Sequence, residues 1–425
     1  MEMSSRQLPF EFIDYSYYDL SDRENELLNY FTEIEDSTIQ KTFDKAYNGR
    51  GPKGFEVRSF LAQMLKVKEN FLSDRSLEGK LLGNSIYRFC CGFRNKTEVP
   101  NHSTYTRMRQ RLGIWSYIDI HINLVNQAYS LGILSPDIAV LPNNRRPGLI
   151  LIADSSFLYA HCSKSGVRDQ NDNLIFKDPS VRIGRPHHRY KFPLGHRVHT
   201  LHTINGIPLV SIVVSANWHD MMYIIPLLDE FRRRFPNIEA AYIILDKGYD
   251  VEPIHEIIYK SYGIIPIIVR KENIKYPKGF HKDGTPLCDY GFPLRRKGID
   301  YKRQRTQHVC DRICIGMNIA QQELFPCPFT ESKQSKYGFV KYTRFKDTIR
   351  LYGPATPNSR IYQTLKPFRT GIERDFALVK ENRYRLQETL NYEGFDAVQQ
   401  HVTLFDIVLI QDKIFKSIST KNQKP

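Results

Sequence analysis

Long apolar runs, a signal peptide and closely paired cysteines are all missing from this chain of 425 residues. No stretch of about 18 apolar residues occurs, so neither a membrane-spanning helix nor a membrane partner is expected. The opening residues, MEMSSRQLPFEFIDYS, lack the basic and then apolar segments of a signal peptide, which favours a cytoplasmic location. Seven cysteines, a small and odd number, argue against a disulfide framework and fit a reducing compartment.

Several catalytic signatures are absent as well. The sequence has no Ser-His-Asp order, no Walker loop and no dinucleotide-binding fingerprint, so hydrolases of those classes and nucleotide-driven motors lack support. Hydrophobic residues at 41% and charged residues at 25% are ordinary for a globular protein. Collagen, coiled-coil and wholly disordered classes are therefore excluded.

Basic residues outnumber acidic residues beyond the first 50 positions. The chain carries 61 Lys and Arg against 46 Asp and Glu, a net charge of +15. Residues 1–50 hold 11 acidic and 5 basic residues, so the remainder carries +21. A positive field of this size favours a polyanionic partner such as nucleic acid, because binding releases condensed counterions. A basic protein without such a partner is the alternative.

The N-terminal third reads as helical. Apolar residues three or four apart predict a helix over 61–68, and Ser73 is a predicted N-cap before a further helical pattern over 76–89. A third helix, TYTRMRQRL, follows Pro100 and ends at Gly113.

This third helix is rich in arginine. Arg107 and Arg111 lie four residues apart on one face, with Arg109 at its side. Three short helices ending in a basic one are typical of a helix-turn-helix DNA-binding bundle. A bundle whose third helix has a solvated basic face is an equally good interpretation.

The pattern then changes to that of an α/β domain. Apolar, β-branched runs separated by helical stretches predict a buried mixed sheet. The predicted strands are residues 149–154, 195–201, 207–216, 241–246 and 264–269. Residues 270–305 are irregular, contain several glycines and prolines, and hold 11 Lys and Arg against 4 Asp and Glu, which indicates a basic insertion with short strands. Helical patterns resume after Pro357.

Two predicted strands end in a carboxylate, at Asp154 and Asp246. Ligands bind at the carboxyl ends of strands in open α/β sheets, and two adjacent carboxylates there require a neutralising cation. Both aspartates also suit the plain role of a helix N-cap.

A later helical segment offers a third carboxylate between cations. Arg369 precedes Glu373 by one helical turn, and Lys380 follows Glu373 by two turns on the same face. Together with Asp154 and Asp246, Glu373 would supply three carboxylates, whose hard oxygen atoms are suitable ligands for Mg²⁺ or Mn²⁺. A salt-bridged, solvent-exposed helix face is the competing interpretation.

Together these residues resemble bacterial insertion-sequence DDE transposases. The spacing Arg369-x3-Glu373-x6-Lys380 matches the Tyr-x2-Arg-x3-Glu-x6-Lys signature of that family, although Lys366 stands at the tyrosine position. The segments IADSS around Asp154 and LDKGYD around Asp246 are similar to the first and second catalytic segments of the family. Its helical N-terminal domain resembles residues 54–113, and ANWHD at 216–220 is similar to a segment near its active site.

The resemblance implies an RNase H-like mixed sheet with an inserted basic subdomain, preceded by an all-α DNA-binding domain. The expected boundaries are 1–140 for the helical domain, 148–270 and 346–412 for the two parts of the catalytic domain, 271–345 for the insertion and 413–425 for a disordered tail.

It also implies roles for individual residues. Asp154, Asp246 and Glu373 would hold two Mg²⁺ or Mn²⁺ ions and catalyse phosphoryl transfer on DNA. Phosphate or DNA contacts are expected from Arg369, Lys380, Lys247, Arg107, Arg109 and Arg111. His219 and Asp220 are accessory candidates near the metals, with a plain helix start as the alternative.

The sequence thus predicts a transposase that binds terminal inverted repeats, cleaves DNA and transfers strands to target DNA. A homodimer is expected in the DNA complex, in the bacterial cytoplasm and at the nucleoid. A metal-dependent nuclease without strand transfer and a non-catalytic DNA-binding relative are the alternatives. Structural zinc is not expected, because only Cys310 and Cys314 lie close together among the cysteines near the insertion, which also include Cys288 and Cys327.

Overall fold

The computed structural model describes most of the chain. The described residues are 20–49, 56–134, 148–172, 174–184, 193–271, 274–281, 283–311, 339–370 and 384–422. The chain divides into two compact units. The first unit contains residues 1–135, 154–236 and 372–425, and the second contains residues 136–153 and 237–371.

The N-terminal part of the first unit is helical, as the sequence predicts. Its helices are α2 (Asp22–Thr32), α3 (Ser37–Tyr47), α4 (Glu56–Lys68), α5 (Asp74–Gly83), α6 (Ser85–Cys91) and α7 (His102–Ser130), with a short 3-10 helix η2 (Lys96–Glu98). The Ser73 side chain caps α5 by accepting from the backbone N–H of Ser76. The pattern predicted over 76–89 forms two helices, because Asn84 caps a new one. Gly113, with φ at 64°, kinks α7 where the sequence predicts an end.

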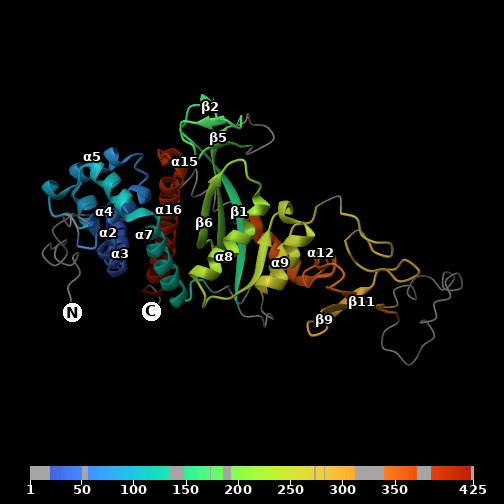
Figure 1. Ribbon diagram of the computed structural model, residues 1–425. Helices are drawn as coiled ribbons and strands as arrows, with labels where there is room; N and C mark the ends of the chain where they lie inside the picture. The colour runs from blue at the N-terminus through green and yellow to red at the C-terminus, as the bar shows by residue number, and fades with distance from the viewer. Residues whose placement is uncertain are drawn as a thin grey trace. The chain divides into compact units, whose positions relative to one another are not determined.

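The last helix, α16 (Phe395–Asn422), completes this helical core, packing against α4 and α7 (Figure 1). The Lys68 ammonium contacts the Asp412 carboxylate at 2.5 Å, and Ile414 is fully buried. The prediction of a disordered tail from residue 413 is therefore wrong through Asn422, because the helix carries apolar side chains onto the core beyond that point.

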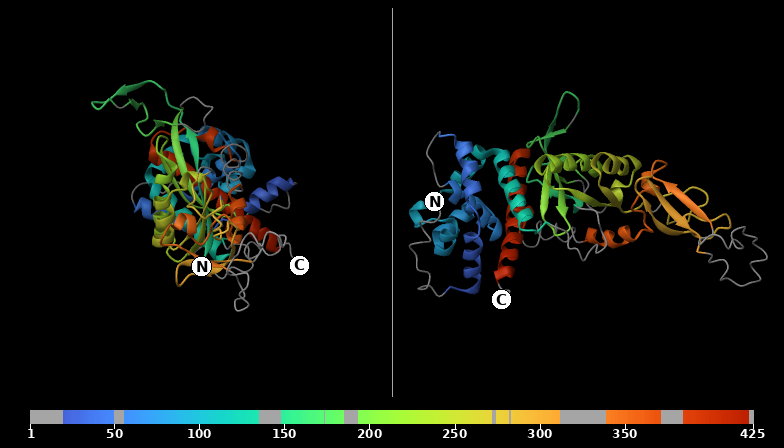
Figure 2. Two further views of the ribbon diagram at one scale, coloured as in Figure 1. Left: turned by 90° about the vertical axis from the view of Figure 1, so that its right-hand side faces the viewer. Right: turned by 90° about the horizontal axis from the view of Figure 1, so that it is seen from below.

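The remainder of the first unit is largely β structure. Strand β5 (Leu194–Thr203) pairs antiparallel with β6 (Pro208–Ser215) and with the short β4 (Arg182–Ile183). Helix α8 (Ile224–Arg234) packs on β6 and β5. A hairpin of β2 (Gly166–Arg168) and β3 (Leu174–Phe176) projects away from the β5–β6 pair (Figure 2). A four-residue helix, α15 (Leu386–Thr389), precedes α16.

Parallel strands form the centre of the second unit. Strand β1 (Leu149–Tyr159) pairs through its first residues with β7 (Ala240–Leu245), which pairs with β8 (Ile265–Ile268). Helix α9 (Glu252–Tyr262) makes the crossover between β7 and β8. Strands β7 and β8 are buried along almost their whole length, which explains their continuous apolar runs. The strand order is β4-β5-β1-β7-β8, with β6 on β5.

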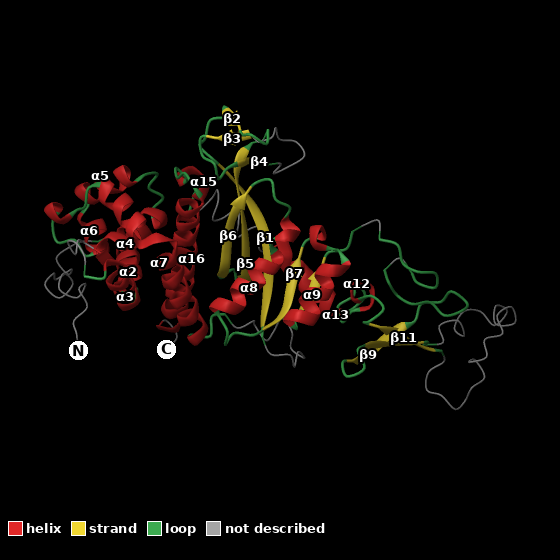
Figure 3. Ribbon diagram, in the orientation of Figure 1, coloured by secondary structure: helices red, strands yellow, loops and turns green. Residues whose placement is uncertain are grey.

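The basic segment of the second unit contains a separate antiparallel sheet of β9 (Arg295–Asp300), β10 (Arg305–Val309) and β11 (Val340–Arg344), drawn in Figure 3. The short strands expected in this segment are thus present. Short helices α12 (Ile349–Tyr352) and α13 (Arg360–Leu365) and the 3-10 helix η5 (Lys366–Phe368) follow.

Candidate active site

Asp246 lies where β7 ends, as the sequence predicts. It is the N-cap of the 3-10 helix η4 (Lys247–Tyr249), and its Oδ1 accepts from the backbone N–H of Lys247 at 2.6 Å. The Arg369 guanidinium lies 3.5 Å from the same oxygen. The Asp246 side chain remains 35% exposed. A carboxylate at a strand end thus has a cation beside it and access to solvent.

Of the three predicted site residues Arg369, Glu373 and Lys380, the structure describes Arg369. Glu373 and Lys380 lie outside the described residues, which resume at Tyr384. Lys366, at the tyrosine position of the signature, is exposed in η5. Lys247 is exposed beside Asp246, whereas Tyr249 is buried in the core. The structure therefore brings together Asp246, Lys247 and Arg369 within the second unit.

Asp154 differs from its predicted position. Strand β1 continues to Tyr159, so Asp154 lies within the strand and not at its end. Its exposure nevertheless changes there, because five buried residues are followed by three half-buried ones beginning with Asp154. The backbone N–H of Ser155 donates to Asp154 Oδ1 at 2.8 Å. Ile152 pairs with Ile244 in the parallel register, and each predicted aspartate follows its isoleucine by two residues.

An arginine that the sequence analysis did not single out lies beside Ser155, the residue after Asp154, in the first unit. Arg197, on β5, contacts Asp220 Oδ1 at 2.5 Å and Ser155 Oγ at 3.4 Å. Asp220 begins the 3-10 helix η3 (Asp220–Met222), and the exposed His219 caps it. The accessory candidate Asp220 is thus held by a cation. An arginine within the alternating strand pattern GHRVHTL is the signal that points to it.

Asp250, four residues after Asp246, is the centre of a buried ion-pair network. Its side chain is fully buried and accepts from Arg270 at 3.0 Å, from Arg350 at 2.9 and 3.0 Å and from His255 at 3.1 Å. Burial opposes its charge, but hydrogen bonds from His255 and Arg350 prevail and hold its pKa far below the usual range. This network joins the segment after β7 to the end of β8 and to α12.

The three arginines of the predicted DNA-binding helix are not equivalent. Arg107 is exposed and donates to Ser103 Oγ at 2.8 Å, and the exposed Arg111 lies 3.8 Å over the ring of Tyr47. The Arg109 side chain is only 11% exposed and contacts Asp74 Oδ2 at 2.6 Å. Arg109 was expected to contact DNA, but the structure engages its guanidinium in the helical core, so we revise its role to packing.

The Arg109 network has a strong electrostatic signature. Asp74 is approached by Arg109 and, at 2.9 Å, by the nearly buried Lys66. Burial raises the pKa of Asp74, yet the two cations outweigh burial and lower it to about 2. The Arg109 guanidinium also lies 5.2 Å from the ring centroid of Tyr392. The network therefore ties α4, α5 and α7 to the segment before α16.

Carboxylate oxygens at Asp154 and Asp246 are the donor type that Mg²⁺ and Mn²⁺ prefer. Among the described residues no three His, Cys, Asp or Glu side chains gather closely enough to hold a metal ion. The predicted third ligand, Glu373, and two of the four cysteines near the insertion lie outside those residues. Cys288 and Cys310, which are described, are both half-buried.

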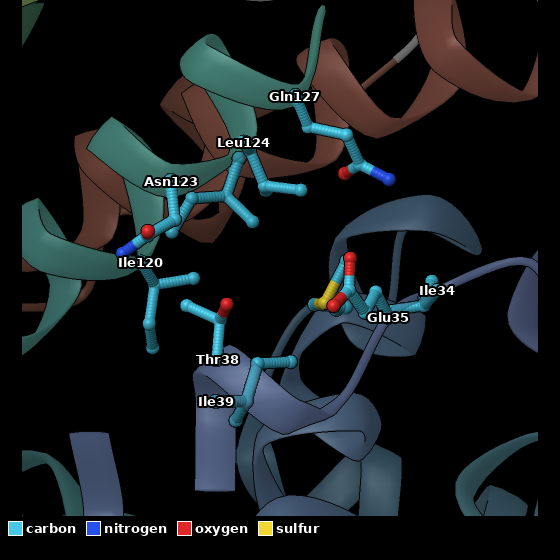
Figure 4. Close-up of a pocket in the computed structure, with 10 residues that line it drawn as sticks. Ile34, Glu35, Thr38, Ile39, Ile120, Asn123, Leu124 and Gln127 are labelled. Atoms are coloured by element: carbon cyan, nitrogen blue, oxygen red, sulfur yellow. The ribbon is translucent and has the colours of Figure 1, made fainter. Parts of the chain in front are cut away.

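A cavity of about 150 Å³ lies elsewhere in the first unit, among α3, α4, α7 and α16 (Figure 4). Its walls combine apolar side chains with the polar residues Glu35, Thr38, Asn123 and Gln127. None of the predicted site residues lines it. Within the described part of the chain, no helix combines the length and apolar character needed to cross a bilayer.

Comparison with protein families gives two matches. The family model described as "Transposase DDE domain" matches residues 145–409. A second model, "Transposase domain (DUF772)", matches residues 15–111, which cover the helical N-terminal part through Arg111. A search of curated proteins gives no match.

Proposed function

The chain belongs to the DDE transposases of insertion sequences, and on this premise we propose that Asp154, Asp246 and Glu373 form one catalytic centre that cleaves and joins DNA. The observation that carries the proposal is the contact of Asp246 with Arg369, four residues before Glu373. Glu373 follows Arg369 by four residues in the sequence, the spacing that the helix predicted there would place on one face. Arg369 thus lies beside the strand-end carboxylate and four sequence positions before the proposed third carboxylate.

The sheet supports an RNase H-like catalytic domain. The strands are ordered β6-β5-β1-β7-β8 across the sheet. The β1–β7 and β7–β8 pairs are parallel. Ile152 of β1 pairs with Ile244 of β7, and Asp154 and Asp246 each follow their paired isoleucine by two residues. In this proposal the basic segment between Asp246 and Glu373 is the insertion of the family.

Each residue has a defined task. Asp154, Asp246 and Glu373 would hold divalent cations through hard oxygen ligands. Such cations, when bound, stabilise the charge on the attacking and leaving oxygens of phosphoryl transfer. Arg369 neutralises Asp246 in part and, with Lys247, presents positive charge to a phosphate beside it. Arg197 keeps the Asp220 carboxylate engaged near Ser155.

The N-terminal helices would bind the terminal inverted repeats through Arg107 and Arg111. Both side chains are exposed on the helical domain that the second family model covers. Lys380 would contact phosphate from the same helix as Glu373. A homodimer in the DNA complex would pair the two ends of the element.

The test is nicking and joining of DNA by the full chain. With Mn²⁺ and a supercoiled plasmid carrying repeat ends, wild-type protein should nick DNA, and Asp246→Asn and Asp154→Asn should abolish nicking without loss of DNA affinity. Asp289→Asn, an exposed aspartate of the second unit, is the matched control and should behave as wild type. Joining of a 3′-hydroxyl end to target DNA separates a transposase from a nuclease. Wild-type nicking by Asp246→Asn would overturn the proposed centre.

A further inference from the structure

The sheet of β9, β10 and β11 is a strongly basic region of the second unit that the proposed catalytic centre does not use. Residues 295–311 and 339–346 hold nine Lys and Arg against two Asp. All of them belong to the described residues. An excess this large within two short stretches favours a polyanion at this place.

The two faces of the sheet differ. On one face, Arg305 lies 4.0 Å over the ring of Tyr342, and Gln307 donates to the Tyr342 hydroxyl at 3.2 Å. These contacts place the three side chains on the same face, together with Arg344, which pairs with Arg305 across the strands. Tyr342 is 42% exposed and Arg344 is exposed. This group of Arg305, Gln307, Tyr342 and Arg344 is called the outward face below.

The reverse face is covered by protein. Thr306, His308 and Thr343 are buried, and His308 shares a hydrogen bond with Thr343. Arg296 donates to the carbonyl of Pro354 at 2.7 Å. Because the reverse face has its own packing partners, the outward face is the side of this sheet that is available to a ligand.

The acidic residues of the sheet are already neutralised. Asp300 contacts Arg305 at 3.4 Å and Arg303 at 3.9 Å, and Asp311 accepts from Arg295 at 3.0 Å. Among the described residues, no carboxylate forms an ion pair with Arg344, and the same holds for the exposed Lys302 and Lys346. Several cations therefore keep their charge available for an external anion.

We infer that the outward face binds the DNA backbone independently of base sequence, as a second DNA surface besides the N-terminal helices. This inference rests on the proposed function only in choosing DNA as the polyanion. Guanidinium groups match phosphate oxygens in a planar, two-pronged geometry, which favours Arg344 as a phosphate contact. The half-exposed ring of Tyr342, with a cation on one side, adds a stacking surface for a neighbouring base.

Two substitutions with opposite expected signs test the inference. Binding of labelled duplex DNA to the full chain is followed by fluorescence anisotropy over a range of salt concentrations, with EDTA to prevent cleavage. Arg344→Gln removes one phosphate contact, so affinity at 0.1 M salt should fall roughly five- to tenfold, and the slope of log K against log salt should flatten by about 0.9. The loss should be equal on repeat-ended and unrelated duplexes, because backbone contacts carry no sequence information.

Asp300→Asn should strengthen binding and steepen the salt dependence, since it releases Arg303 and Arg305 from their carboxylate. Asparagine keeps the oxygen that accepts from the backbone N–H of Arg303, so the turn is preserved. Lys260→Gln is the matched control, because Lys260 is an exposed cation of the same unit that lies on α9 and pairs with Glu256. It should leave affinity and slope unchanged.

The inference is overturned if Arg344→Gln binds like Lys260→Gln, if Asp300→Asn fails to tighten binding, or if the effects occur only with duplex RNA. These outcomes are distinct from failure of the proposed catalytic centre. Arg344-dependent binding without any DNA nicking would refute the proposed function and leave this surface standing. If nicking depends on Asp246 but Arg344→Gln binds DNA like wild type, the proposed function stands and this surface is refuted.

Discussion

Two short charged segments are Asp246–Asp250 in the second unit and Arg107–Arg111 in the first. In each of them, one charged side chain is partly or fully exposed and another of the same sign is buried in an ion-pair network. Asp246 is 35% exposed and meets one guanidinium at 3.5 Å, whereas Asp250 is fully buried among two guanidinium groups and a histidine. Arg107 is exposed, whereas Arg109, two residues later, is ion-paired inside the helical core.

The comparison separates two uses of a charge. A buried charge must be matched by partners, because leaving it alone in a low-dielectric interior is costly. Once its oxygens are occupied by such partners, as at Asp250, a buried charge has little capacity left to bind a ligand. A half-exposed carboxylate such as Asp246, which meets one guanidinium among the described residues, costs the fold little and keeps its capacity to bind a ligand. Charge type alone therefore does not identify a functional residue; the number and burial of its partners do.

The largest expected effect is on catalysis at Asp246. Asp246→Asn should lower the rate of metal-dependent nicking by at least about a thousandfold, since one hard ligand is lost from the centre. Stability to urea should change by only about 0.5 kcal/mol, because the side chain is partly exposed and weakly paired. Plasmid nicking and urea denaturation of the same preparations measure both. A variant that unfolds more readily but still nicks DNA would reverse the assigned roles.

Asp250→Asn should show the opposite profile. Removing this carboxylate leaves the guanidinium groups of Arg270 and Arg350 without their buried partner, and the loss should be about 3–5 kcal/mol of unfolding free energy. Urea denaturation measures it directly. Nicking by the fraction that stays folded should persist at low temperature. Wild-type stability in Asp250→Asn would contradict the role of the network.

In the helical core, the contribution of Asp74 to the free energy of unfolding should depend on pH. Its pKa is lowered from 3.8 to about 2, so it contributes about 2 kcal/mol of stability above pH 4. The sign follows from proton binding: the unfolded carboxyl takes up its proton first as pH falls, so the contribution disappears between about pH 4 and pH 2. The stability difference between wild type and Asp74→Asn should shrink across this range in urea titrations. A constant difference would exclude the ion pairs as its cause.

The smallest effects are expected at Arg107 and Arg111. Replacing either by alanine should leave stability nearly unchanged and flatten the salt dependence of binding to repeat-ended DNA by about 0.9 per lost phosphate contact. Arg109→Ala is the comparison variant and should instead destabilise the fold, since it leaves Asp74 with one cation. Equal salt slopes for Arg107→Ala and wild type would remove Arg107 from the DNA surface.

Much of the local structure was predictable from the sequence. The apolar run AYIILD predicted both strand β7 and the position of Asp246 at its end, because a parallel strand buried on both faces needs continuous apolar residues. The Ser73 cap and the break at Gly113 follow from side-chain oxygen and backbone freedom, which act over a few residues. The family was predictable too, because its charged residues occur at set spacings.

Other features needed the tertiary structure. Strand β1 runs past Asp154 to Tyr159, because the following residues, SSFLY, lie beside β5, about 40 residues later in the chain. The polar segment after residue 412 remains helical, because α16 extends from a buried helix against α4 and α7. Neither outcome can be derived from the composition of the segment itself.

The sequence by itself determined the Ser73 cap, the buried strand that ends at Asp246, and the family to which the chain belongs. Only the tertiary structure decided that Arg109 and Asp250 belong to the core, while Arg107 and Asp246 face solvent. The physical reason is distance along the chain. Caps and periodicity depend on neighbours within one or two turns, whereas Arg109 meets Asp74 from 35 residues away and Asp250 meets Arg350 from 100 residues away. Whether a charge is matched and buried depends on these distant partners.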